Sequence, residues 1–507
     1  MPTQPVAAVS TAEEQAPSLG PSAAAALVFG SSAAVLVIEL VALRLLAPYL
    51  GLTLEMSTAV IGVALAAIAT GSWLGGRAAD VVAPQRMLGP LLLLSGALVA
   101  LILPAVRWTG EIARGGDVSG VLLMAALTLF APAALLSAVT PMVTKVRLTS
   151  LSATGTVVGR LSGIGTAGAI AGTVATGFGF VSAVPSSVTM LSLGGLLVAV
   201  GGLLTVRLRG WRTAAAPVAV ALIGGAATVW GPNPCEVETT YHCASVVNDP
   251  ERSTGRVLVL DTLRHSYVDL ADPTYLHFDY VQAIASAADV LWARGEPLSA
   301  FHLGGGALTL PRYLHAVRPG TRSLVTEIDP GVLEIAVDRL GLEADGAIVT
   351  RTQDARVGLA AQATDSRDLV VADAFSGVAV PWHLATREVV RDAQRVLVDD
   401  GVYTANVIDH PPLDFARAQA ATIASVFDHV VLATSPATLA GDSGGNVVLI
   451  ASDAVLDSEG IQAAIDQRGT GYQVLATGEV EDFAGDAAIL TDDFAPVDQL
   501  LTPYPTL

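Results

Sequence analysis

Lysine is nearly absent from the chain and occurs only at Lys145. Charged residues of all kinds make up only 14% of the 507 residues, and the net charge is −19. Proteins that bind nucleic acids neutralise the phosphates with clustered Lys and Arg. The composition therefore argues against a nucleic-acid partner.

Acidic residues are scarce in the first half of the chain. Few of them occur between residues 23 and 231, so most of the negative charge lies after residue 235. The mean hydropathy of +0.58 is high for a soluble protein. A chain of this length has room for at least two domains. The uneven charge predicts that an apolar N-terminal domain is followed by an acidic C-terminal one.

Basic residues are missing from residues 1–21, which are rich in Ala, Pro, Ser, Thr and Gln. A cleaved signal peptide begins with a positively charged region. We therefore expect residues 1–21 to form a disordered tail.

Long hydrophobic runs fill most of residues 22–232. A helix that crosses the bilayer core needs about 20 apolar residues. The interiors of these runs carry almost no charge and show no polar face, unlike a surface helix of a soluble protein. The pattern predicts an α-helical transmembrane domain, embedded in the lipid bilayer of the cell membrane. The seven expected spans are residues 23–47, 56–76, 87–106, 119–144, 161–183, 185–206 and 213–231.

Two ionisable residues lie in the first expected span, Glu39 in its middle and Arg44 near its end. Such groups cost free energy inside a membrane and often mark a pathway or a bound ligand. The alternative is an ion pair within the helix bundle, or an Arg side chain that reaches the interface. Both interpretations stay open.

Small residues and a short loop mark two other parts of this domain. The segment 71–80, GSWLGGRAAD, resembles the loop between the second and third helices of major-facilitator transporters. Glycines around the fifth span recur mostly at four-residue spacing, which lets helices pack closely. These glycines are Gly155, Gly159, Gly163, Gly168 and Gly172.

The most informative run of the C-terminal part is FHLGGGALTLPRYLHAV, residues 301–317. A hydrophobic strand is followed by Gly304, Gly305 and Gly306 and then by an amphipathic helix. The next strand ends in Glu327, 21 positions after Gly306. Glycine lets the backbone approach a ligand, and an acid about 20 residues further on binds ribose hydroxyls. The spacing predicts a nucleoside site.

Further strands alternate with helical segments over residues 347–355, 368–375, 401–408 and 429–435. This alternation predicts a doubly wound, largely parallel sheet of the Rossmann type. Asp354 and Asp373 end two of these strands. Because the glycine loop is not GxGxxG, a nucleoside without a pyrophosphate fits better than a dinucleotide. Asp354, followed by the small Ala355, suits an adenine ring.

The segments LGGGALTLPRYL, VTEIDP, QDAR and VVADAFSGVAVPWHLATREV resemble the spermidine synthase family of aminopropyltransferases. They are most similar to its membrane-fused branch, in which transmembrane helices precede the synthase domain. The resemblance covers about residues 235–450 and implies a spermidine-synthase-like domain over residues 233–507. It implies a core of the S-adenosylmethionine-dependent methyltransferase type that binds decarboxylated S-adenosylmethionine as co-substrate. No permanently bound cofactor is expected.

The resemblance also implies a role for each motif. The three glycines would contact the aminopropyl-sulfonium region, Glu327 the ribose, and Asp354 with Ala355 the adenine. Asp373 matches the family's catalytic base, and a carboxylate is a sensible acceptor for the proton of an attacking amine. Helix capping by Asp373 is the alternative. The sulfonium supplies the leaving group, so we expect no metal.

Several positions depart from the family's pattern. The glycine loop normally ends in an Asp that holds the ligand's amine, but here it ends in Ala307, and the second acid of the D-x-x-D motif is Ser376. The family's Gln after the first strand pair is His265, and Tyr280 matches a pocket tyrosine. A charge-assisted hydrogen bond contributes roughly 1.5–3 kcal/mol. Losing both carboxylates would weaken diamine binding on the order of a hundredfold, so putrescine is a doubtful substrate.

Three functions remain open at this point. The first is a membrane-anchored transferase that acts on a small-molecule amine acceptor and that could form a homodimer. The second is a methyltransferase on the same core, which Ala307 favours because no aminopropyl amine need be held. The third is a transporter or sensor that binds a nucleoside or polyamine without chemistry, as Glu39 and the loop at 71–80 suggest.

Two features of the sequence predict that the soluble domain lies outside the cytoplasm, and a third argues for the cytoplasm. The ends and loops after spans two, four and six hold eight basic residues, against three after spans one and three. The positive-inside rule then places the soluble domain outside the cytoplasm. Cys235 and Cys243, the only cysteines, could form a disulfide there. Against this, S-adenosyl donors are made in the cytosol.

Overall fold

The computed structural model describes residues 19–50, 54–113, 118–148, 150–261, 263–343 and 346–502. Most of the expected N-terminal tail lies outside these residues. The contacts divide the chain into two compact units, with the main boundary between Pro232 and Asn233.

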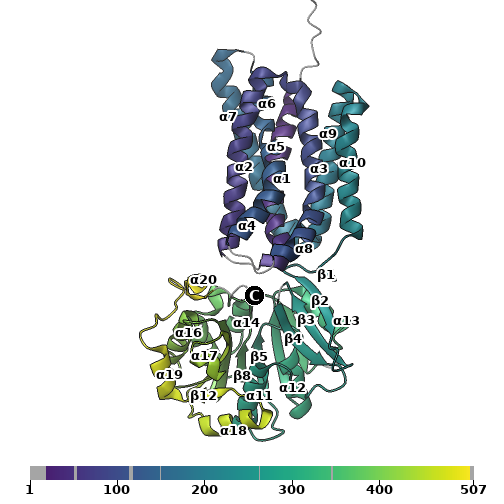
Figure 1. The fold of residues 1–507 in the computed structure, drawn as a ribbon. Helices are drawn as coiled ribbons and strands as arrows, with labels where there is room; N and C mark the ends of the chain where they lie inside the picture. The colour runs from purple at the N-terminus through teal and green to yellow at the C-terminus, as the bar shows by residue number, and fades with distance from the viewer. Residues whose placement is uncertain are drawn as a thin grey trace, which may run out of the picture. The chain divides into compact units, whose positions relative to one another are not determined.

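The first unit is helical (Figure 1). Within the described residues, seven helical segments are long and apolar enough to cross a membrane, which agrees with the number predicted. They are Pro21–Tyr49, Met56–Val81, Pro84–Gly110, Leu122–Arg147, Leu151–Phe180, Ser186–Arg209 and Trp211–Trp230. The long helices are α1 (Pro21–Leu50), α2 (Leu54–Val81), α3 (Pro84–Ala113), α7 (Thr154–Ala175), α9 (Ser186–Arg209) and α10 (Trp211–Trp230). Shorter helices are α4 (Val118–Ala125), α5 (Ala131–Ser137), α6 (Val139–Arg147) and α8 (Val181–Ala183), with π-helical turns at Ala126–Phe130 and Thr176–Phe180 and a 3-10 turn at Leu151–Ala153.

Glycines allow the closest helix contacts in this unit. A Cβ added to Gly168 would lie 2.2 Å from the carbonyl oxygen of Phe29, and one added to Gly172 would lie 2.6 Å from that of Ala33. These distances are far below van der Waals contact, so α7 can approach α1 only with glycine at both positions. The other three glycines of the predicted pattern have no atom within 4 Å of such a Cβ.

One of the two ionisable residues of the first span has a described backbone partner. Arg44 donates from Nη1 to the carbonyl oxygen of Val181 in α8, at 3.5 Å. This contact is of the kind expected for a bundle residue that satisfies backbone groups inside a membrane. The role of Glu39 stays a prediction.

The second unit begins with a small antiparallel sheet of four strands in the order β1-β2-β3-β4. Its strands are β1 (Val237–Glu238), β2 (Cys243–Asn248), β3 (Gly255–Leu260) and β4 (Leu263–Asp269). One face packs through Ala244, Leu258 and Val268 against Val332 and Ile335 of α13 (Pro330–Asp338).

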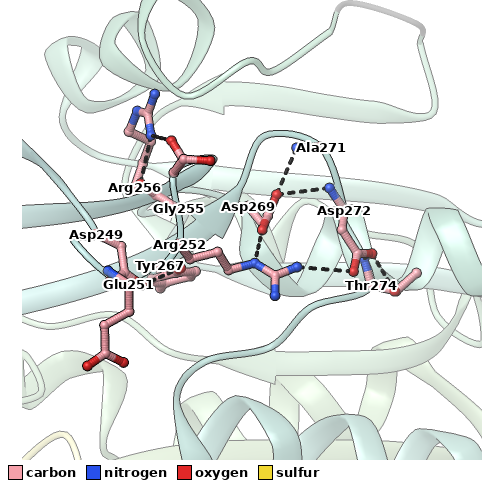
Figure 2. A network of polar contacts seen from close by, with 11 residues as sticks. Asp249, Glu251, Arg252, Gly255, Arg256, Tyr267, Asp269, Ala271, Asp272 and Thr274 are labelled. Carbon is pink, nitrogen blue, oxygen red and sulfur yellow. Dashed lines mark hydrogen bonds and ion pairs between the residues drawn. The ribbon is translucent and has the colours of Figure 1, made fainter.

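A polar network fixes the far end of β4 (Figure 2). The guanidinium of Arg252 binds the carboxylates of Asp269 and Asp272, and Tyr267 donates its hydroxyl proton to Asp249 at 2.7 Å. Burial of Asp269 opposes its ionisation, but hydrogen bonds from Arg252 and from neighbouring residues lower its pKa to about 2. Asp269 is therefore a carboxylate at neutral pH, and it anchors the strand that carries His265 and Ser266.

The main sheet has eight strands in the order β12-β10-β11-β9-β8-β5-β6-β7. Strands β5 to β9 pair in parallel, while β11, β10 and β12 add antiparallel strands beside β9. The strands are β5 (Ser299–Leu303), β6 (Arg322–Glu327), β7 (Ile348–Thr352), β8 (Arg367–Ala372), β9 (Leu397–Asp409), β10 (His429–Thr434), β11 (Gly445–Ser452) and β12 (Gln473–Leu475). The predicted α/β fold and its strands are confirmed.

Apolar side chains cover both faces of this sheet. One cluster packs α15 and α16 against the sheet and includes Phe301, Val390 and Phe415, and another packs α11 and α18 and includes Ile284 and Ile450. The helices are α11 (Asp279–Leu291), α12 (Thr309–Val317), α14 (Ala355–Ala360), α15 (Arg387–Val396), α16 (Asp414–Ala424), α17 (Pro436–Leu439), α18 (Ser458–Arg468), α19 (Thr477–Ala484) and α20 (Val497–Leu500), with a 3-10 turn η4 (Trp382–Leu384). Because the strand order reverses between β5 and β8, a ligand crevice is expected at the carboxyl ends of these two strands.

Candidate functional site

A cavity of about 370 Å³ lies at that position. It is lined by residues that follow β5, β6, β7 and β8, by β9 and β11, and by the edge of the four-stranded sheet. The size is within the range of small-molecule sites. The cavity brings together every predicted ligand-binding residue except Ser376.

Glycine is required at two positions of the loop after β5. Gly304 has φ +96°, and a Cβ there would lie 2.4 Å from the carbonyl oxygen of Asp373. Gly306 has φ +49°, and a Cβ there would lie 2.5 Å from Oγ of Ser266. Both the backbone conformation and the available space exclude a side chain. The loop is consequently held between β8 and β4.

Glu327, at the end of β6, joins this loop to the neighbouring strand. Its Oε2 accepts the N–H groups of Gly305 at 2.9 Å and Gly306 at 3.4 Å, and its Oε1 accepts the N–H of Asp329 at 3.0 Å. Glu327 also lines the cavity. Oε2 already accepts two hydrogen bonds, whereas Oε1 accepts one and keeps a lone pair for a hydroxyl donor from a ligand.

Asp354 and Ala355 form the wall beyond β7. One carboxylate oxygen of Asp354 caps α14 by accepting the N–H of Val357 at 3.1 Å, and the other lies 2.9 Å from Nε2 of His383. Ala355 is buried, and its methyl group leaves room in the cavity. His383 also lines the cavity.

Asp373, directly after β8, accepts hydrogen bonds on both carboxylate oxygens. Tyr280 donates its hydroxyl proton to Oδ2 at 3.2 Å, and Asn406 donates from Nδ2 to Oδ1 at 2.9 Å. Burial raises the pKa of Asp373, while the two hydrogen bonds oppose that rise. The partners are side chains, and the next helical turn begins only at Trp382, so the geometry does not suit a helix cap.

The three positions that depart from the family's pattern lie in different surroundings. Ala307 is fully buried, and its N–H donates to Oγ of Ser266 at 3.2 Å. His265 lines the cavity, and burial lowers its pKa to about 4, so it is neutral at physiological pH. Ser376 is exposed, its N–H bonds the carbonyl oxygen of Ala379, and its side chain is not part of the cavity lining.

The cavity lining also contains polar residues that the sequence did not predict, and four of them lie near Asp373 or Tyr280. Asn406 and Asn446 face the cavity from β9 and β11, and Asp279 and Tyr472 line it beside Tyr280. An amide within an otherwise apolar strand, as in VYTANVI, is a local signal for Asn406. The others come from segments far apart in the chain, and no local spacing relates them.

Cys235 and Cys243 are joined by a disulfide. Within the loop that they close, Thr239 donates to Oδ2 of Asp329 at 2.5 Å, and the N–H of Tyr241 donates to the same oxygen at 3.1 Å. The loop is thereby attached to the segment that follows Glu327. Across the part of the chain that the structure describes, no cluster of His, Cys, Asp and Glu is suited to a metal ion.

Fold and site together define the second unit as a Rossmann-like α/β domain of the methyltransferase type, with an acid-lined cavity at the strand ends. No family model matches the chain. The polyamine aminopropyltransferase of Vibrio vulnificus is 28% identical over 240 residues, which are 44% of this chain and 76% of that protein. The probable polyamine aminopropyl transferase of Bifidobacterium longum is 26% identical over 288 residues, which are 52% of this chain and 61% of that protein. These relatives confirm the resemblance to the spermidine synthase family.

Among solved structures, a probable spermidine synthase from Corynebacterium glutamicum is similar, with 28% identity and a TM-score of 0.49. The match covers 53% of this chain and 98% of that protein.

Proposed function

We propose that the protein is a membrane-anchored transferase that moves an aminopropyl group from decarboxylated S-adenosylmethionine to an amine acceptor. The observation that carries the proposal is Asp373, a half-buried carboxylate held by Tyr280 and Asn406 directly beside the glycine loop. The test is to identify the nucleoside released when the protein acts on the donor, because each type of transferase leaves a different one.

The residues that line the cavity favour one orientation of the donor. The glycine loop admits close approach of the sulfonium region, Oε1 of Glu327 offers a lone pair to a ribose hydroxyl, and Asp354 with Ala355 faces the adenine. Asp373 then lies on the side of the sulfonium where an acceptor enters. This direction matches the spacing of acids along the ends of β6, β7 and β8.

The chemistry needs one proton acceptor and no metal. The neutral amine attacks the carbon beside the sulfur, so that a C–N bond forms while the C–S bond breaks and its electrons return to sulfur. Methylthioadenosine leaves as a neutral thioether. Asp373 accepts the proton that the new ammonium must lose, and its raised pKa brings the carboxylate closer to the pH at which a general base works best.

A methyltransferase on the same core is the second candidate. Ala307 favours it, because this buried methyl group provides no charge to hold the amine of a decarboxylated donor. In that reaction the methyl group leaves the sulfonium, and the nucleoside product is S-adenosylhomocysteine.

Ser376 is not part of the cavity lining, but a second acid, Asp279, lies in the cavity beside Tyr280, a hydrogen-bond partner of Asp373. Asp279 lies in the first turn of α11, one residue before Tyr280, and burial raises its pKa. A carboxylate in this position can bind the far ammonium of a diamine. We predict that Asp279→Asn raises KM for 1,4-diaminobutane by about tenfold, the effect of one charge-assisted hydrogen bond, and leaves KM for n-butylamine unchanged.

Initial rates with the two amines check this prediction, with Asp338→Asn as the matched control on the exposed end of α13. If Asp279 serves only to stabilise the N-terminus of its helix, its loss affects both amines equally. That result would remove Asp279 from the acceptor site.

We infer that the catalytic domain lies outside the cytoplasm. The greater number of basic residues after spans two, four and six supports this orientation, and so does the Cys235–Cys243 disulfide, because disulfides persist in oxidising compartments. The donor must then cross the membrane or be supplied outside.

A membrane-impermeant maleimide tests the orientation on intact cells in a Cys235→Ser/Cys243→Ser background. Val455→Cys, at an 80% exposed position of the catalytic domain, is expected to react before lysis. Leu151→Cys, at an 89% exposed position after the fourth span, is expected to react only after lysis. The reverse pattern would place the catalytic domain in the cytoplasm.

A further inference from the structure

Two asparagines lie behind the carboxylate of Asp373 on neighbouring strands. Asn406 is on β9 and Asn446 is on β11, and the antiparallel register pairs Asn446 with Ile408 and Val448 with Asn406. Positions 406 and 446 are thus diagonal neighbours on the same face of the sheet, within reach of each other's side chains. Asn406 is only 3% exposed.

The two amides form a directed chain of hydrogen bonds that ends at the carboxylate. Asn446 donates from Nδ2 to Oδ1 of Asn406 at 3.0 Å, and Asn406 donates from Nδ2 to Oδ1 of Asp373 at 2.9 Å. The main chain of Asn446 is itself held, because Thr434 donates its hydroxyl proton to the carbonyl oxygen of Asn446 at 2.7 Å.

The hydrogen bonds fix the orientation of the Asn406 side chain, because one end of an amide donates and the other accepts. If the side chain of Asn406 turned by half a rotation, its Oδ1 would face the carboxylate oxygen of Asp373 and its Nδ2 would face the Nδ2 of Asn446. The first contact would place two acceptors together and the second two donors. With the Nδ2 of Asn446 directed at Asn406 as in the structure, this contact selects the one orientation in which Asn406 stabilises a negative charge on Asp373.

We propose that Asn446 is a positioning residue that acts through Asn406 to keep the carboxylate of Asp373 ionised. Asn446 need not touch the reacting atoms to do so. The link to catalysis depends on the role of Asp373 in the proposed function, whereas the effect on ionisation depends only on the hydrogen-bond chain.

Loss of these hydrogen bonds is expected to raise the pKa of Asp373. A hydrogen bond donated to a carboxylate lowers its pKa, so removal of the donor raises the pKa of Asp373 beyond the rise that burial already causes. Asp373 then stays protonated to a higher pH, and a function that needs the carboxylate is lost first in acid.

Other ionisable groups around Asp373 do not reproduce this effect. Tyr280 and Tyr472 have pKa values raised by burial and stay neutral below pH 10. Asp279, Glu327 and His265 also line the cavity. All three are unchanged in the Asn446 and Asn406 variants, so they contribute equally to each of them. Asp373→Asn isolates their contribution, because it removes only the group in question.

The test measures binding of n-butylamine to the full-length protein by calorimetry between pH 5 and pH 9, in the presence of methylthioadenosine. Asn446→Leu is expected to weaken binding about tenfold at pH 6, the effect of one charge-assisted hydrogen bond, and to match the unmodified protein at pH 9. Asn446→Asp, whose carboxylate attracts the Nδ2 of Asn406 and turns the amide, is expected to give a larger loss at pH 6. In an Asn406→Leu background, Asn446→Leu is expected to add nothing.

A loss that is equal at every pH, or that adds fully to the effect of Asn406→Leu, would overturn the proposal and leave Asn446 a packing or direct-contact residue. If Asn446→Leu fails to fold, Asn446→Ser removes the amide with less disturbance and is read in the same way. A protein that shows the pH-dependent loss but no turnover with any amine would retain the positioning role and refute the transferase instead.

Discussion

Replacement of Asp373 by asparagine is expected to lower kcat by about a hundredfold or more, the usual effect of losing a general base. Asparagine keeps the size of the side chain and can still accept the hydrogen bond from Tyr280. It cannot accept the proton of the attacking amine. The variant is therefore expected to bind the donor normally and to fail at the chemical step, which single-turnover rates with saturating donor measure.

Ser376→Ala is the matched control for Asp373→Asn. Ser376 is exposed, and its side chain is not part of the cavity lining. The kcat of Ser376→Ala is therefore expected to stay within about twofold of that of the unmodified protein. Equal losses in the two variants would show that the base is misassigned.

Glu327→Ala is expected to weaken binding of methylthioadenosine at least about tenfold. The change removes the acceptor of two glycine-loop N–H groups and of the Asp329 N–H, and it removes the partner of the ribose hydroxyls. Charge-assisted hydrogen bonds of this kind contribute roughly 1.5–3 kcal/mol each, which corresponds to tenfold or more in affinity. Titration calorimetry measures the change directly.

Glu334→Ala serves as the control because it removes an exposed acid from α13, a few residues further along the chain. The affinity of Glu334→Ala for methylthioadenosine is expected to equal that of the unmodified protein. Unchanged affinity in Glu327→Ala, with the fold intact by circular dichroism, would mean that the nucleoside does not bind at the end of β6.

The parts of the molecule that depend on short-range patterns could be predicted from the sequence. The helical spans follow from runs of apolar residues, and the glycine loop with Glu327 follows from one strand–loop–helix–strand unit of about 30 residues. Within such a unit the distance between motif residues is fixed by secondary structure alone. Asp354 and Asp373 were found for the same reason, since each ends a recognisable strand.

The acceptor side of the cavity could not be predicted in this way. Asn446 meets Asn406 across 40 residues and Asn406 meets Asp373 across 33, so their contacts depend on the strand order and on the register of β11 against β9. Ser376 shows the opposite case, because its position in the motif predicts a cavity residue while the turn after β8 leaves it exposed. A short loop can rotate a side chain outward without any change in the pattern of residues.

The departures at Ala307 and Ser376 concern recognition of charge, whereas the proposed base Asp373 and the acids proposed to face the donor, Glu327 and Asp354, all line the cavity. A protein with this arrangement can keep the transfer reaction and change the way in which it holds the amine groups. Asp279 and the neutral His265 are the residues through which such a change would act.

The nucleoside product tests the central claim most directly. The full-length protein, in detergent or nanodiscs, would be incubated with 1,4-diaminobutane and either decarboxylated or intact S-adenosylmethionine, and the products identified by mass spectrometry. The account predicts release of methylthioadenosine from the decarboxylated donor, together with an aminopropylated amine, and loss of both products in Asp373→Asn. Formation of S-adenosylhomocysteine from the intact donor, with no methylthioadenosine from the decarboxylated one, would contradict it.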